Sequence, residues 1–172
     1  MAKKKKEKAE GGQEGKGTKE LKIISVSVVR PEQVVRNPRQ MGLLYIIDKL
    51  GPTHERTLQH IVYELQTEYG VDFGYDFRKI GNTPYSPQLK TDIVQLLYVG
   101  FIETEPSLYR KLRTTSTGKD ALEKHGAPPK VVETLNANFE ALRNKTSMLD
   151  EQLDLEIRKR MQLSRPRRRF PF

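Results

Sequence analysis

Residues 85–103 read YSPQLKTDIVQLLYVGFIE, and this stretch decides the predicted fold. Ser86 followed by Pro87 is typical of a helix start, because a serine side chain caps a free backbone N–H and proline suits the first helical position. Gly100 is typical of a helix end. Between them, apolar residues recur with helical spacing at Leu89, Ile93, Leu96 and Leu97. The stretch therefore predicts a helix that turns directly into the residues after Gly100.

Two short strands and a further helix are expected immediately downstream. The strands cover Phe101–Glu105 and Leu108–Thr114 and are joined by a short turn that contains proline. In the second strand apolar and polar side chains alternate, which is the pattern of a strand with one buried face. The helix is expected over Ser116–His125.

Upstream, a strand and two helices are expected. Leu21–Arg30 is dense in isoleucine and valine, which favours a strand that ends at the following proline. Apolar spacing predicts a first helix over Gln40–Leu50 and a second helix that Thr53 begins and Tyr69 closes. The next residues, Val71–Tyr85, form a loop rich in aromatic rings, which either stack on exposed bases or, as is favoured, pack against the core.

Three helices, a two-stranded hairpin and another helix follow one another in the order of a winged helix, and local motifs are similar as well. Residues 85–103 resemble the recognition-helix segment of winged-helix regulators, in which a leucine-rich helix ends in Gly-hydrophobic-Ile. Residues 112–119, LRTTSTGK, resemble the second wing strand and the following helix start of the PadR-like and MarR-like families. The resemblance covers about residues 40–126, half of the chain. It implies a mainly α fold with a small β-sheet: a winged helix-turn-helix with a long C-terminal helical extension.

The resemblance also implies how the chain would hold nucleic acid. In winged-helix proteins the third helix lies in the major groove and the wing touches the backbone or the minor groove. Carried over to this chain, the groove-facing residues are Gln88, Lys90, Thr91 and Gln95, and the wing residues are Arg110, Lys111 and Arg113. The third helix carries no arginine, so only its two glutamines are of a type that reads adenine.

Positive charge is concentrated at the two ends of the chain, which has 172 residues and a net charge of +9. Residues 1–20 carry seven lysines and four glutamates, and residues 158–172 carry seven basic residues and no acid. Basic arms on a nearly neutral body favour a polyanion as partner, because each neutralised phosphate releases counterions. The C-terminal candidates are Arg165, Arg167, Arg168 and Arg169, followed by Phe170 and Phe172.

The C-terminal third is expected to be helical, with two interpretations open. Leucine recurs every seven residues, and the apolar set is Leu135, Phe139, Leu142, Leu149 and Leu153. This spacing favours a coiled-coil helix and a homodimer. Alternatively, Ser147 with Asp150 three residues later is a helix N-cap signature, which would give two helices that fold back on the body.

Composition argues against several classes of function. The absence of cysteine removes disulfides and thiol nucleophiles, and three isolated histidines do not suggest a metal site. No nucleophile elbow or recognisable His-acid spacing is found, so we expect no enzyme, no cofactor, no metal and no small-molecule substrate. No apolar run approaches the roughly 20 residues of a membrane span, and no secretory signal is expected.

The sequence predicts four segments and one main function. The segments are a disordered basic tail (1–20), a winged-helix domain with an extra N-terminal strand (21–126), a helical extension (127–163) and a basic Arg/Phe tail (164–172). The expected protein is a non-enzymatic transcription regulator or chromatin-type protein in the cytoplasm, associated with the nucleoid or the ribosome, with DNA narrowly favoured over RNA. The alternative is a structural RNA-binding component of a ribonucleoprotein such as a ribosomal subunit, which the neutral body favours. High Lys and Glu content suits a thermophilic archaeal source.

Overall fold

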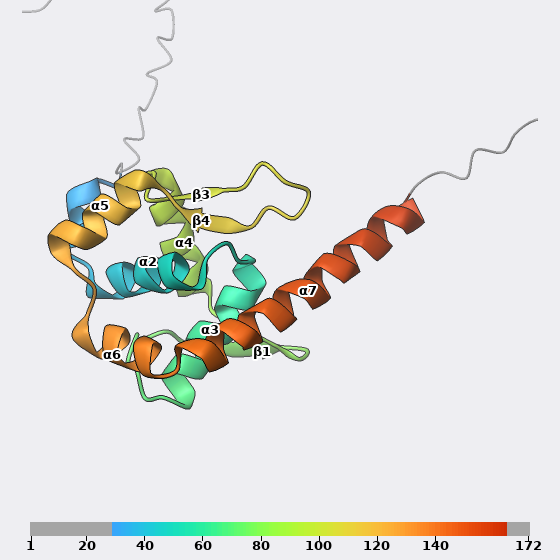
Figure 1. Cartoon of the computed structure of the whole chain (residues 1–172), viewed down its shortest axis with the longest axis horizontal. Helices are drawn as coiled ribbons and strands as arrows, with labels where there is room; N and C mark the ends of the chain where they lie inside the picture. The colour runs from blue at the N-terminus through green and yellow to red at the C-terminus, as the bar shows by residue number, and fades with distance from the viewer. Residues whose placement is uncertain (1–28, 165–172) are drawn as a thin grey trace, which may run out of the picture.

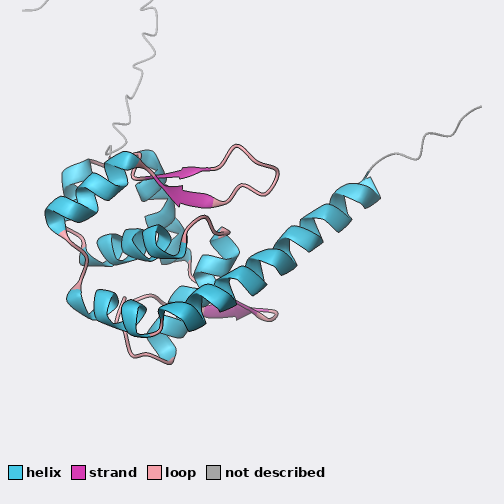
Figure 2. Ribbon diagram, in the orientation of Figure 1, coloured by secondary structure: helices cyan, strands magenta, loops and turns pink. Residues whose placement is uncertain are grey.

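The computed structural model describes residues 29–164 and is mainly helical, with two small antiparallel sheets (Figure 2). The helices are α1 (Pro31–Val35), α2 (Pro38–Leu50), α3 (Glu55–Thr67), α4 (Pro87–Tyr98), α5 (Ser116–His125), α6 (Pro129–Ala137) and α7 (Phe139–Ser164). The strands are β1 (Arg78–Ile80), β2 (Thr83–Tyr85), β3 (Ile102–Thr104) and β4 (Leu112–Thr114). The predicted class, mainly α with a small β component, is confirmed. The tails 1–20 and 165–172 and nearly all of the predicted strand at 21–30 lie outside the described residues.

Side-chain caps fix where three of the helices begin. The Ser86 hydroxyl accepts from the Leu89 N–H at 3.4 Å, so α4 begins where the sequence predicts. Thr115 accepts from the Gly118 N–H at 3.1 Å and caps α5, and Asn37 caps α2 in the same way. These caps satisfy backbone donors that a helix cannot pair internally.

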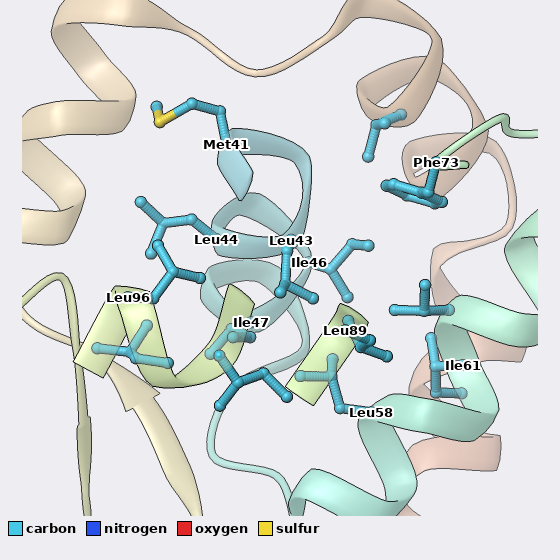
Figure 3. Close-up of a cluster of buried hydrophobic side chains, with 14 of the residues drawn as sticks. Met41, Leu43, Leu44, Ile46, Ile47, Leu58, Ile61, Phe73, Leu89 and Leu96 are labelled. Atoms are coloured by element: carbon cyan, nitrogen blue, oxygen red, sulfur yellow. The ribbon is translucent and has the colours of Figure 1, made fainter. Parts of the chain in front are cut away.

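The core is built around α2, which is buried on nearly every side (Figure 3). Its four central apolar side chains are fully buried: Leu43, Leu44, Ile46 and Ile47. One stripe of α3 and one of α4 pack onto them; the largest members are Leu58, Ile61, Leu65, Leu89, Ile93 and Leu96. Because α4 buries only one stripe, its opposite face is left to solvent.

The structure has two hairpins, of which the sequence predicted only one. The hairpin β3–β4 was expected, and its second strand also pairs with Thr53, whose backbone exchanges hydrogen bonds of 2.8 and 3.1 Å with Leu112. The hairpin β1–β2 lies inside the aromatic segment and was not predicted. In that segment Phe73 and Tyr75 are buried in the core cluster, as the packing interpretation expects.

Gly118 allows α5 to approach the start of β3 closely. A Cβ added at this position would lie 2.1 Å from the carbonyl oxygen of Phe101, far inside any tolerable contact. The glycine in the Thr-x-x-Gly sequence at 115–118 is therefore a packing requirement of the hairpin and helix together.

The structure of the C-terminal region differs from the predicted coiled-coil helix. The helix breaks at Asn138, which has φ −115° and ψ 19°, and not near Ser147. Leu135 and Leu142 are buried in the chain's own core, so they are not available to a coiled-coil partner. The remaining members of the set, Phe139, Leu149 and Leu153, are half-buried. The region up to Asp154 therefore packs on the body, as the alternative interpretation proposed, whereas the rest of α7 extends past the body (Figure 1).

Candidate nucleic-acid interface

The outer face of α4 is a short mixed surface of polar and apolar side chains. Lys90, Thr91, Val94 and Tyr98 are exposed and share one side of the helix. Val94 and Tyr98 are 53% and 63% exposed, which is high for such large apolar groups. No ion pair joins Lys90 to another residue between 29 and 164, so its charge is open to a ligand.

The inner face of α4 is fixed by a buried carboxylate, Asp92. It accepts from the Tyr75 hydroxyl at 2.8 Å and from Gln40 Nε2 at 2.9 Å, and it pairs with Arg39 Nε at 2.7 Å. Burial, together with the negative charge of Asp92, raises the pKa of Tyr75 far above its ordinary value, so this phenol stays a donor. Three partners from α2 and the aromatic segment therefore set the rotation of α4 and hold Lys90 outward.

Both glutamines predicted to read bases are engaged within the chain. Gln88 accepts from the Asp76 N–H at 2.8 Å and donates to the Asp76 carboxylate at 3.1 Å. Gln95 is half-buried and accepts from Gln40 Nε2. The hydroxyl of Thr91 donates to the Pro87 carbonyl at 3.0 Å. Of the four predicted groove-facing residues, Lys90 and Thr91 are exposed, while Gln88 has both amide atoms and Gln95 has its amide oxygen engaged within the chain.

On the hairpin β3–β4, where the sequence predicts a wing, only one of the three predicted cations is free of carboxylate partners among the described residues. Arg110 is exposed at the tip and has φ +48°, which is unusual for a residue other than glycine. Arg113 pairs with Glu103 across the hairpin at 2.7 Å. Lys111 pairs with Asp150 at 3.4 Å and Asp154 at 3.2 Å, both on α7. On this hairpin Arg110 is therefore open to a ligand, whereas Lys111 holds α7.

We call the contact of α7 with the body at this point the α7 clamp; its members are Thr53, His54, Thr57, Lys111, Asp150 and Asp154. Asp150 is 5% exposed and accepts from the hydroxyls of Thr53 and Thr57 and from the His54 N–H. Asp154 contacts His54 Nε2 at 2.7 Å. Sequence analysis missed this cluster, although two aspartates spaced by four on one helix face were a readable signal.

Two ionisable groups of the α7 clamp have shifted pKa values. Burial raises the pKa of Asp154, but hydrogen bonds from His54 and Lys111 lower it more, and the net shift is downward. Burial lowers the pKa of Lys111, but Asp150 and Asp154 raise it more, and the net shift is upward. The folded state thus favours the charged form of both groups.

We expect the contribution of Asp154 to stability to disappear in acid. Because the pKa of Asp154 is lower in the folded state, its ionised carboxylate stabilises the folded state at pH values above the unfolded-state pKa of about 3.9. This stabilisation is lost as the pH falls through the folded-state pKa. Asp154→Asn should lower Tm by about 2–4 °C near neutral pH, corresponding to about 1 kcal/mol. Thermal melts followed by circular dichroism should show this gap closing below about pH 4. A gap that stays constant into strong acid would contradict the assignment.

Basic side chains also gather where α7 extends away from the body. Arg158, Lys159 and Arg160 are exposed there, and Arg158 donates to the hydroxyl of Tyr109 in the loop between β3 and β4. Figure 1 shows that the hairpin β3–β4 and this end of α7 project toward the same side of the molecule. The predicted arm residues Arg165, Arg167, Arg168 and Arg169 follow directly and lie outside the described residues.

Between residues 29 and 164 no group of three metal-ligating side chains comes together, and none of the helices has the length and apolar character to cross a membrane. Comparisons of the chain with known families, with curated proteins and with solved structures find no match.

Proposed function

We propose that this chain is a non-enzymatic winged-helix protein that binds duplex DNA mainly through phosphate contacts, as a chromatin-type protein or transcription regulator. In this proposal α4 enters the major groove, the hairpin β3–β4 is the wing, and the basic arms add affinity. The binding tolerates many sequences because few groups on α4 are free to read bases.

The observation that carries the proposal is the joining of the helical unit to the hairpin. The elements α2, α3, α4, β3 and β4 follow in the order expected of a winged helix. The backbone pairing of Thr53 with Leu112 ties the connection between α2 and α3 to the hairpin. This bridge supports treating the third helix and the wing as one rigid surface.

The distribution of free charge supports phosphate contacts. Residues 29–164 contain 19 basic and 18 acidic side chains, so the body as a whole gives no strong attraction. Lys90 on α4 and Arg110 on the wing are nonetheless exposed and outside the ion pairs that join described residues. Placed against a duplex, each would neutralise a phosphate and release counterions.

The shape of the exposed surface favours DNA over duplex RNA. The major groove of B-form DNA admits an α-helix, whereas that of A-form RNA is too narrow for one. A helix face flanked by a hairpin, as α4 and β3–β4 provide, therefore suits DNA. Two observations favour the ribonucleoprotein alternative. One is the near neutrality of the body, and the other is that Gln88 and the amide oxygen of Gln95 form hydrogen bonds within the chain.

We expect the double variant Lys90→Ala/Arg110→Ala to bind duplex DNA about tenfold more weakly than the wild type. Its slope of log affinity against log salt should be shallower by about 1.8, since each phosphate contact contributes about 0.9. Fluorescence anisotropy with a labelled duplex measures both quantities. Lys124→Ala, an exposed lysine at the end of α5, is the matched control and should leave the slope unchanged. Equal losses in the control and the double variant would overturn the assigned surface.

A further inference from the structure

We propose that the outward face of α7 is a dimer interface on which a second copy of this chain packs antiparallel. The inference is independent of nucleic-acid binding. It also uses a different set of residues from the leucine heptad, of which Leu135 and Leu142 are buried in the chain's own core.

The outward face is defined by what α7 buries on its other side. Leu142, Thr146 and Asp150 are buried at intervals of four and face the body. Met148 and Leu155, seven residues apart, point the other way and are 62% and 53% exposed. In Figures 1 and 2, α7 runs across the front of the molecule with no other element over it, and then continues past the body. At 26 residues it is about 39 Å long, enough to pair with a partner along several turns.

The charges on the free part of α7 are segregated along its axis. The exposed acids Glu151 and Glu156 come first, and the exposed bases Arg158, Lys159 and Arg160 follow. No ion pair joins Glu151 or Lys159 to another residue of the described segment 29–164. Within residues 151–160 the acidic side chains therefore precede the basic ones. Glu156 pairs with Arg56 and Arg158 donates to Tyr109, whereas Glu151 and Lys159 are open to a partner.

Charge complementarity selects a second copy in antiparallel orientation. In an antiparallel pair with its two-fold axis at Leu155, a residue four positions before Leu155 on one helix lies opposite the residue four positions after Leu155 on the partner's helix. Glu151 of each copy then faces Lys159 of the partner's helix, and the pairing occurs twice because a two-fold interface is isologous. A parallel pair would set acid against acid and base against base, which is unfavourable.

A charge exchange tests this interface without disturbing the fold, since both residues are exposed. Glu151→Lys and Lys159→Glu should each weaken dimerisation about tenfold at low salt, because each creates two like-charge contacts. The double exchange Glu151→Lys/Lys159→Glu should restore the wild-type dissociation constant to within about twofold. Sedimentation equilibrium at micromolar concentrations measures these constants.

Lys124→Glu reverses an exposed charge at the end of α5, which Figure 1 places on the opposite side of the molecule from the free end of α7, and serves as the control that keeps the wild-type constant. Leu155→Asp should give a monomer, because it places two charges at the centre of the seam. A wild-type chain that stays monomeric at the highest concentration, or single exchanges that dimerise as well as the wild type, would overturn the proposal. So would a double exchange that fails to restore dimerisation.

Discussion

Asp150→Ala should lower the free energy of unfolding by about 3 kcal/mol, which is among the largest effects expected of a single substitution here. Asp150 accepts from Thr53, His54 and Thr57 and pairs with Lys111 while only 5% exposed. Alanine would leave these buried donors without an acceptor and Lys111 with one carboxylate in place of two. Urea unfolding followed by circular dichroism gives the free energy.

Two further variants separate the contributions of Asp150. Asp150→Asn keeps a side-chain oxygen for the donors but removes the charge, so we expect an intermediate loss. Asn144→Ala changes an exposed residue of the same helix and should stay within about 0.5 kcal/mol of the wild type. An Asp150→Ala protein as stable as Asn144→Ala would show that the α7 clamp does not hold α7 on the body.

Removal of residues 165–172 should weaken duplex DNA binding about a hundredfold and lower the salt slope by between 3 and 4 units. The deleted segment carries four arginines and no acid. At about 0.9 unit for each phosphate, four contacts account for the whole change. Anisotropy titrations at several salt concentrations, with the full chain and the truncated chain side by side, measure it.

A charge-only variant separates the arginines from the two phenylalanines in the same segment. Replacing the four arginines with glutamine keeps the length, Phe170 and Phe172, and it should reproduce the loss of slope. If slope and affinity were instead retained without the arginines, the C-terminal arm would have no part in phosphate binding.

Local signals in the sequence predicted much of the fold. The Ser86 cap and the leucine spacing after it placed α4, because a cap and an amphipathic stripe involve residues only a few positions apart. The hairpin β1–β2 was missed, although Gly81-Asn82 is a recognised two-residue hairpin turn. Its flanking strands have only three residues each, too few to show an alternating pattern.

Interactions between segments that are distant in the chain could not be predicted from the sequence. A leucine every seven residues shows that one face of a helix is buried, but it does not tell whether the covering surface is a second chain or the same one. Leu135 and Leu142 proved to face the chain's own core. Likewise, the sequence around Lys111 does not show its ion pair, because the partner Asp150 lies 39 residues later and comes beside it only in the fold. The sequence therefore did not predict which candidate residues are exposed and which are paired within the chain, and the structure was needed to show it.

The most direct test of the central claim compares the affinity of the full chain for a labelled DNA duplex and for an RNA duplex of the same length and sequence across a salt series. We expect tighter binding to DNA and a steep negative salt slope. A chain that binds neither duplex at low salt, or that prefers RNA, would contradict the proposed function.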